Sequence, residues 1–135
     1  DTNCTLWITI KIRIDLAIVA KPRMTRSDRW KKRPCVVRYW EFADKLRAAA
    51  AAANFKLGNK VHMEFHIEMP KSWSKKKREK MEGEPHQLPK RMDIDNLQKS
   101  CFDILRPDDD GMIYDIQARK FWADKPVIKI GNGNG

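Results

Sequence analysis

The segment KVHMEFHIEMP, residues 60–70, has the clearest periodic pattern in this chain of 135 residues. Apolar side chains stand at every second position from Val61 to Met69, with polar or charged side chains between them. Such alternation predicts a β-strand with one buried face, because successive side chains of a strand point to opposite sides of its sheet. Pro70 ends the strand, since proline has no N–H to donate to a neighbouring strand.

The segments before and after this strand predict further strands and helices. Strict alternation from Thr5 to Leu16 predicts a long first strand. The other expected elements are a helix from Pro34 to about Asn54, a short basic helix capped by Ser72 or Ser74, a helix from about Asp95 to Leu105, and strands near Met112–Trp122 and Val127–Ile130. The order β-α-β-(α)-α-β-β, without a linker or repeat, predicts a single α+β domain over residues 1–135, a mixed β-sheet packed against helices.

Composition excludes several classes of protein. Charged residues make up 34% of the chain. Hydrophobic residues make up 41%, which is more than a disordered chain usually contains. No apolar run approaches the roughly 18 residues that a transmembrane helix needs, and the first residues do not resemble a signal peptide. The three cysteines have no short spacing that would indicate a disulfide framework or a metal site. We therefore expect a cytoplasmic protein that does not bind membranes.

Positive charge is concentrated in two segments. Lys plus Arg number 28 against 18 Asp plus Glu, a net charge of +10. The basic loop, residues 21–33, has seven basic residues against one acidic residue, and the basic insertion, residues 70–91, has eight against three. This concentration favours a surface for a polyanion such as nucleic acid over a diffuse, solubilising charge. The basic side chains that we expect on DNA are Lys21, Arg23, Arg26, Lys31, Lys32, Arg33, Lys75, Lys76 and Lys77.

The segment DIDNLQKSCFD, residues 93–103, carries the candidate chemistry. Asp93 and Asp95 stand two residues apart where the chain enters a helix, so both carboxylates can face the same way. Two neighbouring carboxylates repel each other unless a cation lies between them, and Mg²⁺ prefers oxygen ligands. Within the helix, Asp95, Lys99 and Asp103 fall on one face.

A structural interpretation of the same acids is open at this point. Asp95 could cap the helix while Asp93 is an ordinary loop residue, since aspartate is common at helix caps. The basic surroundings favour a metal-dependent nuclease over this interpretation.

The segment resembles the signature of the RusA-type Holliday junction resolvases, which are crossover junction endodeoxyribonucleases. That signature is an Asp-x-Asp-Asn-Leu-x-Lys core, an Asp four residues after the Lys, and a later Asp followed by a small residue and Gln. The core and the following Asp match residues 93–103, and Tyr114-Asp115-Ile116-Gln117 matches the later element. Lys21-Pro22-Arg23 is similar to the basic element that follows the first strand in the family. The resemblance covers residues 6–130, and residues 70–89 resemble phage-type members.

The resemblance implies roles for individual residues. It makes Asp93, Asp95 and Asp115 the metal-binding catalytic carboxylates and Lys99 the catalytic cation, with Asn96 among the residues that contact DNA. The family often has an acidic pair before the Gln, but Tyr114 replaces the first acid here. The third ligand is therefore open between Asp115 and the acidic run Asp108, Asp109 and Asp110.

These observations predict a Mg²⁺-dependent, structure-selective DNA endonuclease that resolves Holliday junctions by paired nicks in recombination and repair, with Mn²⁺ as a possible substitute. Because a four-way junction has two-fold symmetry and the chain has one Asp93/Asp95 pair, a homodimer is expected. The alternatives are a non-catalytic nucleic-acid-binding protein on a RusA-like scaffold and an RNA-binding or ribonucleolytic domain.

Histidines and tryptophans outside the motif receive simpler predictions. His62 and His66 are four residues apart, about 13 Å in an extended strand, so we expect surface histidines and no shared metal. His86 is expected in solvent or against phosphate. Trp73 could stack on an unpaired base or pack its loop onto the domain, and Trp40 is expected to be structural.

Overall fold

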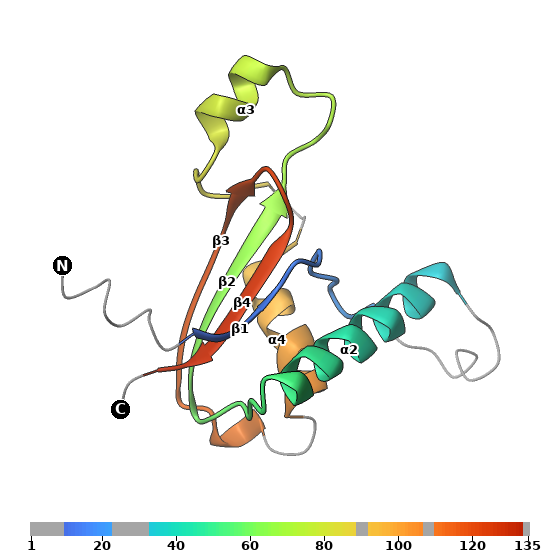
Figure 1. Cartoon of the computed structure of the whole chain (residues 1–135), viewed down its shortest axis with the longest axis vertical. Helices are drawn as coiled ribbons and strands as arrows, with labels where there is room; N and C mark the ends of the chain where they lie inside the picture. Colours follow the sequence, from blue (N-terminus) through green and yellow to red (C-terminus); the bar gives the residue numbers. More distant parts are fainter. Residues whose placement is uncertain (1–9, 23–32, 89–91, 107–109, 134–135) are drawn as a thin grey trace.

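A computed structural model describes residues 10–22, 33–88, 92–106 and 110–133. Within them the chain forms four strands and three helices in the expected order (Figure 1). The elements are β1 (Ile10–Ile14), α2 (Pro34–Ala52), β2 (Lys60–Glu68), α3 (Lys75–Met81), α4 (Ile94–Leu105), β3 (Asp115–Ala123) and β4 (Val127–Asn132), with a 3-10 turn at Asp110–Met112 before β3. The predicted α+β class and mixed sheet are confirmed.

The four strands form one sheet in the order β1-β4-β2-β3. Strand β2 runs parallel to β3 and antiparallel to β4, and β4 runs antiparallel to β1. In this register Phe65 of β2 lies opposite both Lys120 of β3 and Ile128 of β4. The alternating segment 60–68 is therefore an interior strand.

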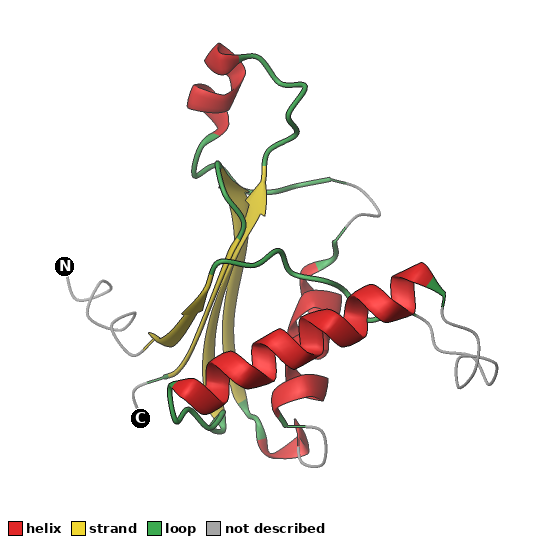
Figure 2. Cartoon of the chain, turned by 45° about the vertical axis from the view of Figure 1, so that its right-hand side comes forward, coloured by secondary structure: helices red, strands yellow, loops and turns green. Residues whose placement is uncertain are grey.

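Helices α2 and α4 cover one face of the sheet (Figure 2). The apolar side chains of β2 lie beneath them, and Val61, Met63 and Phe65 are fully buried. Helix α2 contributes Tyr39, Phe42 and Leu46 to this core, and α4 contributes Leu97, Cys101 and Ile104. Burial raises the pKa of the Cys101 thiol to about 12, so this cysteine stays neutral and serves packing.

The ends of α2 follow from its sequence. Pro34 occupies the first helical position, where its missing N–H costs nothing. The helix ends at Ala52, and Asn54 adopts a left-handed conformation with φ of 52°, which asparagine tolerates better than most residues. No helix in the described residues is both long enough and apolar enough to span a membrane.

Helix α3 projects beyond the end of the sheet (Figure 1). Ser74 caps it, as one of the two predicted alternatives, by accepting a hydrogen bond of 3.2 Å from the Lys77 N–H. Arg78 ties the helix to the sheet, because its guanidinium donates to the Pro70 carbonyl and to Asp124, both at 2.9 Å. None of the seven residues of α3 is buried, in keeping with its charge.

Some predictions from the sequence differ from the structure. The described part of the first strand is Ile10–Ile14, and residues 5–9 of the predicted strand lie outside the described residues. Trp40 is 43% exposed, so the expectation of a structural tryptophan is wrong. Its neighbours Tyr39 and Phe42 occupy the buried face of α2 instead.

Candidate functional site

The acidic pair lies at the start of α4. Asp93 immediately precedes the helix, Asp95 lies in its first turn, and both side chains are exposed. Asp93 occupies the cap position, but its side chain makes no capping hydrogen bond. Asp95 lies inside the helix and so is not its cap. The structural interpretation of Asp95 as the cap is therefore wrong, and neither carboxylate is used to cap α4.

The polar face of α4 forms as predicted. Asp95 and Lys99 are exposed, and Asp103 is half-buried. The Asp103 Oδ2 accepts a hydrogen bond of 3.3 Å from the Lys21 Nζ. This contact holds the start of the basic loop against the helix that carries the acidic pair.

Two hydrogen bonds fix the position of α4. The fully buried Ser100 donates its Oγ–H to the Val19 carbonyl at 2.7 Å. The Lys120 Nζ donates to the Met92 carbonyl at 2.8 Å, one residue before Asp93. Met92 has φ of 51°, a left-handed conformation that is unfavourable for a methionine. The Lys120 contact therefore helps to stabilise the strained backbone of Met92, which directly precedes Asp93 and α4.

Asp115 lies apart from the acidic pair. It begins β3 opposite Lys60, and its Oδ2 is 3.8 Å from the Lys60 Nζ. The core-facing Val61 and Met63 lie opposite Ile116 and Ala118. Since facing residues of paired strands point to the same side of the sheet, Asp115 belongs to the side opposite α4.

The end of α4 confirms this separation. Arg106, directly after α4, donates to the Gly58 carbonyl and the Asn59 Oδ1 beside the start of β2. Asp115 is therefore near the last turn of α4, whereas Asp93 and Asp95 are at its first. No group of three His, Cys, Asp or Glu side chains that could hold a metal ion occurs among the described residues. Of the alternatives for the third ligand, Asp108 and Asp109 lie outside the described residues.

The donor chemistry of Asp93 and Asp95 suits a hard cation. They supply carboxylate oxygens at an exposed helix start, and Mg²⁺ is often held by one or two carboxylates together with waters and substrate phosphates. The pair therefore fits a magnesium ion shared with a phosphate group of a substrate.

The predicted DNA-binding side chains are distributed over separate regions. Lys21 lies at α4, Asn96 is exposed beside Asp95, and Arg33 is half-buried just before α2. Arg23, Arg26, Lys31 and Lys32 lie outside the described residues. Lys75, Lys76 and Lys77 are exposed on α3, which projects beyond the end of the sheet.

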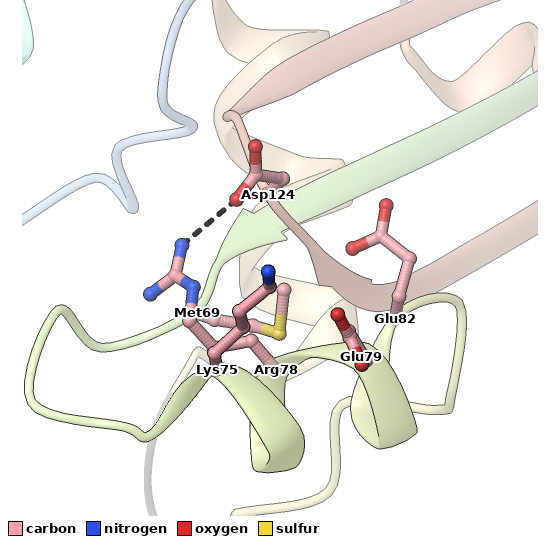
Figure 3. A pocket seen from close by; sticks show the side chains of 6 residues that line it. All are labelled: Met69, Lys75, Arg78, Glu79, Glu82 and Asp124. Atoms are coloured by element: carbon pink, nitrogen blue, oxygen red, sulfur yellow. Dashed lines mark hydrogen bonds and ion pairs between the residues drawn. The ribbon is translucent and has the colours of Figure 1, made fainter.

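Helix α3 has two different sides. A cavity of about 370 Å³ lies on the side that is tied to the sheet (Figure 3), and its lining is Met69, Lys75, Arg78, Glu79, Glu82 and Asp124. A second hollow of similar volume is lined by Ser74, Lys76, Lys77, Lys80 and Met81, without an acidic side chain. The sequence did not distinguish Lys75 from its neighbours, but the structure places it among acids.

Trp73 packs onto the domain. Its ring centroid lies 4.8 Å from that of the buried Trp122, and the Lys77 Nζ lies 4.2 Å from the Trp73 ring centre. Of the two predicted roles, packing is the one the structure shows.

The prediction that the histidines lie on the surface is wrong. His62 and His86 are buried and His66 is half-buried. The ring of His86 packs against Trp122 at 4.4 Å between centroids, and its Nδ1 has no hydrogen-bond partner among the described residues. The burial of His86 was not predictable from the sequence, because it arises where residues 83–86 fold back along β3 through backbone hydrogen bonds.

The environment of His86 predicts a pH-dependent stability. Burial, and next the charge of Lys120, lower the pKa of His86 below its ordinary value. In the unfolded chain His86 binds a proton as the pH falls below about 6.5, whereas in the folded chain it stays neutral until a lower pH. The contribution of neutral His86 to the free energy of unfolding is therefore fully present above that pH. It is lost as the pH falls toward the lower pKa of His86 in the folded chain.

Urea unfolding at pH 7.5 and pH 5.5 tests this effect. Wild type is expected to lose more free energy of unfolding over this interval than His86→Phe, which keeps an aromatic ring against Trp122 but does not titrate. An equal loss in both proteins would show that His86 does not contribute. His66, whose pKa is also lowered mainly by burial, remains in both proteins and cancels in the comparison.

Comparison with known proteins agrees with the motif. The family model for endodeoxyribonuclease RusA matches residues 15–131, nearly the whole chain. No curated protein and no solved structure matches the chain. The matched region includes the acidic pair, Lys99, Asp115 and both basic segments. The chain therefore belongs to the RusA family of endodeoxyribonucleases.

Proposed function

We propose that this protein is a Mg²⁺-dependent, structure-selective endonuclease that resolves four-way DNA junctions by paired nicks. The observation that carries the proposal is the exposed Asp93/Asp95 pair at the start of α4, in a chain of the RusA family. Neither carboxylate makes a capping hydrogen bond to the helix. The proposed setting is DNA recombination and repair in the cytoplasm of a bacterium or of a phage-infected cell.

Asp93 and Asp95 are the residues that would hold the ion, and Mn²⁺ is expected to substitute for Mg²⁺. When bound, such an ion polarises a phosphoryl oxygen and lowers the pKa of a bound water. The family resemblance makes Asp115 a further ligand. Because Asp115 lies on the side of the sheet opposite α4, the proposed metal site consists of Asp93 and Asp95.

Lys99 supplies positive charge beside the pair. It lies four residues after Asp95, which is one helical turn, and its side chain is exposed. A lysine in this position can approach a phosphate oxygen and stabilise the negative charge that develops during hydrolysis. Asn96, also exposed in the first turn, can donate hydrogen bonds to the DNA backbone.

The hollow lined by Lys76, Lys77 and Lys80 is proposed as a binding surface for a junction arm. The Lys76→Ala/Lys77→Ala variant should bind the junction more weakly. The slope of the logarithm of its binding constant against log salt should become shallower by about 0.9 for each phosphate that the variant no longer neutralises. Lys75→Ala is the matched control, because Lys75 lines the cavity that contains Glu79, Glu82 and Asp124. A salt slope equal to that of wild type in the double variant would place this side of α3 away from DNA.

The proposed active form is a homodimer. A chain with one Asp93/Asp95 pair can cut one strand at a time, and a two-fold dimer presents two such pairs to a junction of the same symmetry. Coordinated nicks in opposing strands then separate the junction into two duplexes.

A synthetic junction assay tests the proposal against two alternatives. Four-way junction, linear duplex, single strand and a matching RNA are incubated with and without Mg²⁺. Mg²⁺-dependent nicking of the junction above all other substrates is expected. Junction binding without cutting would favour the non-catalytic alternative, which the distance of Asp115 from the acidic pair supports. Preference for RNA would favour a ribonucleolytic or RNA-binding protein.

A further inference from the structure

The chain enters the acidic pair through a strained residue, Met92. It directly precedes Asp93 and has φ of 51°, in the left-handed region that most side chains avoid. Its side chain packs against the hydrophobic core. Because the backbone angles of a residue set the direction of the chain that follows, this conformation determines how Asp93 and α4 leave the turn. A residue keeps such a φ only where surrounding contacts hold it.

Strand β3 supplies one of these contacts. The Lys120 Nζ donates to the Met92 carbonyl at 2.8 Å. The helical bonds of α4 begin one residue later, where the Asp93 carbonyl accepts from the Leu97 N–H at 3.1 Å. The Met92 carbonyl thus lies just outside the helix. The lysine therefore acts on the turn itself and does not replace a bond of the helix.

The backbone of Lys120 is fixed on both of its edges. On one edge Lys120 pairs with the fully buried Phe65 of β2, so both side chains lie on the side of the sheet that α4 covers. On the other edge the Lys120 carbonyl accepts from the His86 N–H at 3.2 Å. The side chain of Lys120 is half-buried. Lys120 is therefore a rigid anchor for the turn.

Helix stability alone does not explain a lysine at this place. A cation at the N-terminus of a helix opposes the helix dipole. A positive charge close to a divalent ion also repels that ion. Both effects are unfavourable for Lys120, whose Nζ is bonded to the carbonyl next to Asp93. The favourable effect that remains is the support of the Met92 backbone.

We propose that Lys120 is a positioning residue for the acidic pair. By holding the Met92 carbonyl, it maintains the left-handed turn that presents Asp93 and Asp95 together to a divalent ion. Lys120 acts through the main chain and touches neither the ion nor the DNA. The inference rests on the proposed function and deepens it, because it explains how the proposed metal site keeps its shape.

Binding of Mn²⁺ to the protein without DNA tests the proposal, with free Mn²⁺ measured by electron paramagnetic resonance. Lys120→Met keeps most of the aliphatic chain but removes the donor. Its dissociation constant for Mn²⁺ is expected to rise by about 10–100-fold. The effect of charge alone has the opposite sign, because loss of a nearby positive charge strengthens cation binding. Lys120→Arg, which can still donate to the Met92 carbonyl, should bind Mn²⁺ nearly as wild type does.

Lys129→Met is the matched control. Lys129 is a half-buried lysine of β4 that pairs with Glu64, on the side of the sheet away from α4. The substitution makes the same chemical change in the same sheet, so a general effect of losing a lysine would appear in both variants. Lys129→Met should leave the Mn²⁺ affinity unchanged.

A glycine at residue 92 tests whether Lys120 acts through the turn. Glycine adopts a positive φ without strain, so the turn of Met92→Gly no longer depends on the lysine. Lys120→Met should therefore weaken Mn²⁺ binding far less in the Met92→Gly background than in the wild-type background, as a double-mutant cycle measures. Equal losses in the two backgrounds would overturn the proposal, as would Mn²⁺ binding by Lys120→Met that is unchanged or tighter.

Amide hydrogen exchange at Leu97 gives a readout that needs no metal. This N–H donates to the Asp93 carbonyl, so it reports on the geometry that Met92 imposes. Exchange should be faster in Lys120→Met than in Lys129→Met, and equal rates would overturn the role of Lys120. A wild type that binds no Mn²⁺ would contradict the proposed metal site, and the exchange rates would still decide the role of Lys120. A wild type that binds Mn²⁺ but cuts no junction would contradict only the nuclease.

Discussion

The Asp95→Asn variant is expected to bind a four-way junction and to cut it at least about 100-fold more slowly than wild type. Asp95 is exposed in the first turn of α4, and the substitution removes the charge that it would offer to a divalent ion while keeping the shape of the side chain. Binding should stay equal or become tighter, because one negative charge near the phosphates is lost. Rates at saturating protein and binding without Mg²⁺ separate the two effects.

Asp44→Asn is a matched control for this variant. Asp44 is an exposed aspartate on α2 that pairs with Arg47 at 3.3 Å, so the substitution makes the same chemical change away from α4. It should leave nicking unchanged. Nicking by Asp95→Asn at the rate of wild type would remove Asp95 from the site.

The Leu97→Ala variant is expected to lose about 2–5 kcal/mol of unfolding free energy. Leu97 lies two residues after Asp95 in sequence but faces the core, where it is fully buried. Truncation leaves a cavity between α4 and the sheet. Urea unfolding measures the loss, and a junction assay on the folded fraction reports whether the loosened helix still positions Asp95 and Lys99.

Gln98→Ala is the control, because Gln98 is the next residue of α4 and is only half-buried. Its expected cost is about 0.5 kcal/mol or less. A cost below about 1 kcal/mol for Leu97→Ala would mean that α4 packs less closely on the sheet than the structure shows.

Local sequence patterns predicted most of the fold. The alternation in residues 60–68 fixes which side of β2 is buried, since a strand has only two sides. In α4 the spacing of Leu97, Cys101 and Ile104 separates a buried stripe from the exposed Asp95 and Lys99. The motif predicted the acidic pair because both residues belong to one short segment.

Features that depend on contacts between distant segments were not predictable. The side of the sheet on which Asp115 lies is set by its register with Lys60, 55 residues earlier in the sequence. The burial of His86 depends on a loop that bonds along β3, and the position of Lys75 depends on how Arg78 ties α3 to Asp124. No local period carries this information, because such pairings depend on the whole chain.

A cruciform plasmid treated with a mixed dimer tests whether two Asp95-bearing sites cut one junction in concert. Wild-type chains and tagged Asp95→Asn chains are mixed, and the dimer with one chain of each kind is isolated. With Mg²⁺, wild type is predicted to give linear plasmid, whereas the mixed dimer is predicted to give mostly nicked circles. Linear plasmid from the mixed dimer at the rate of wild type would contradict cutting by two paired sites.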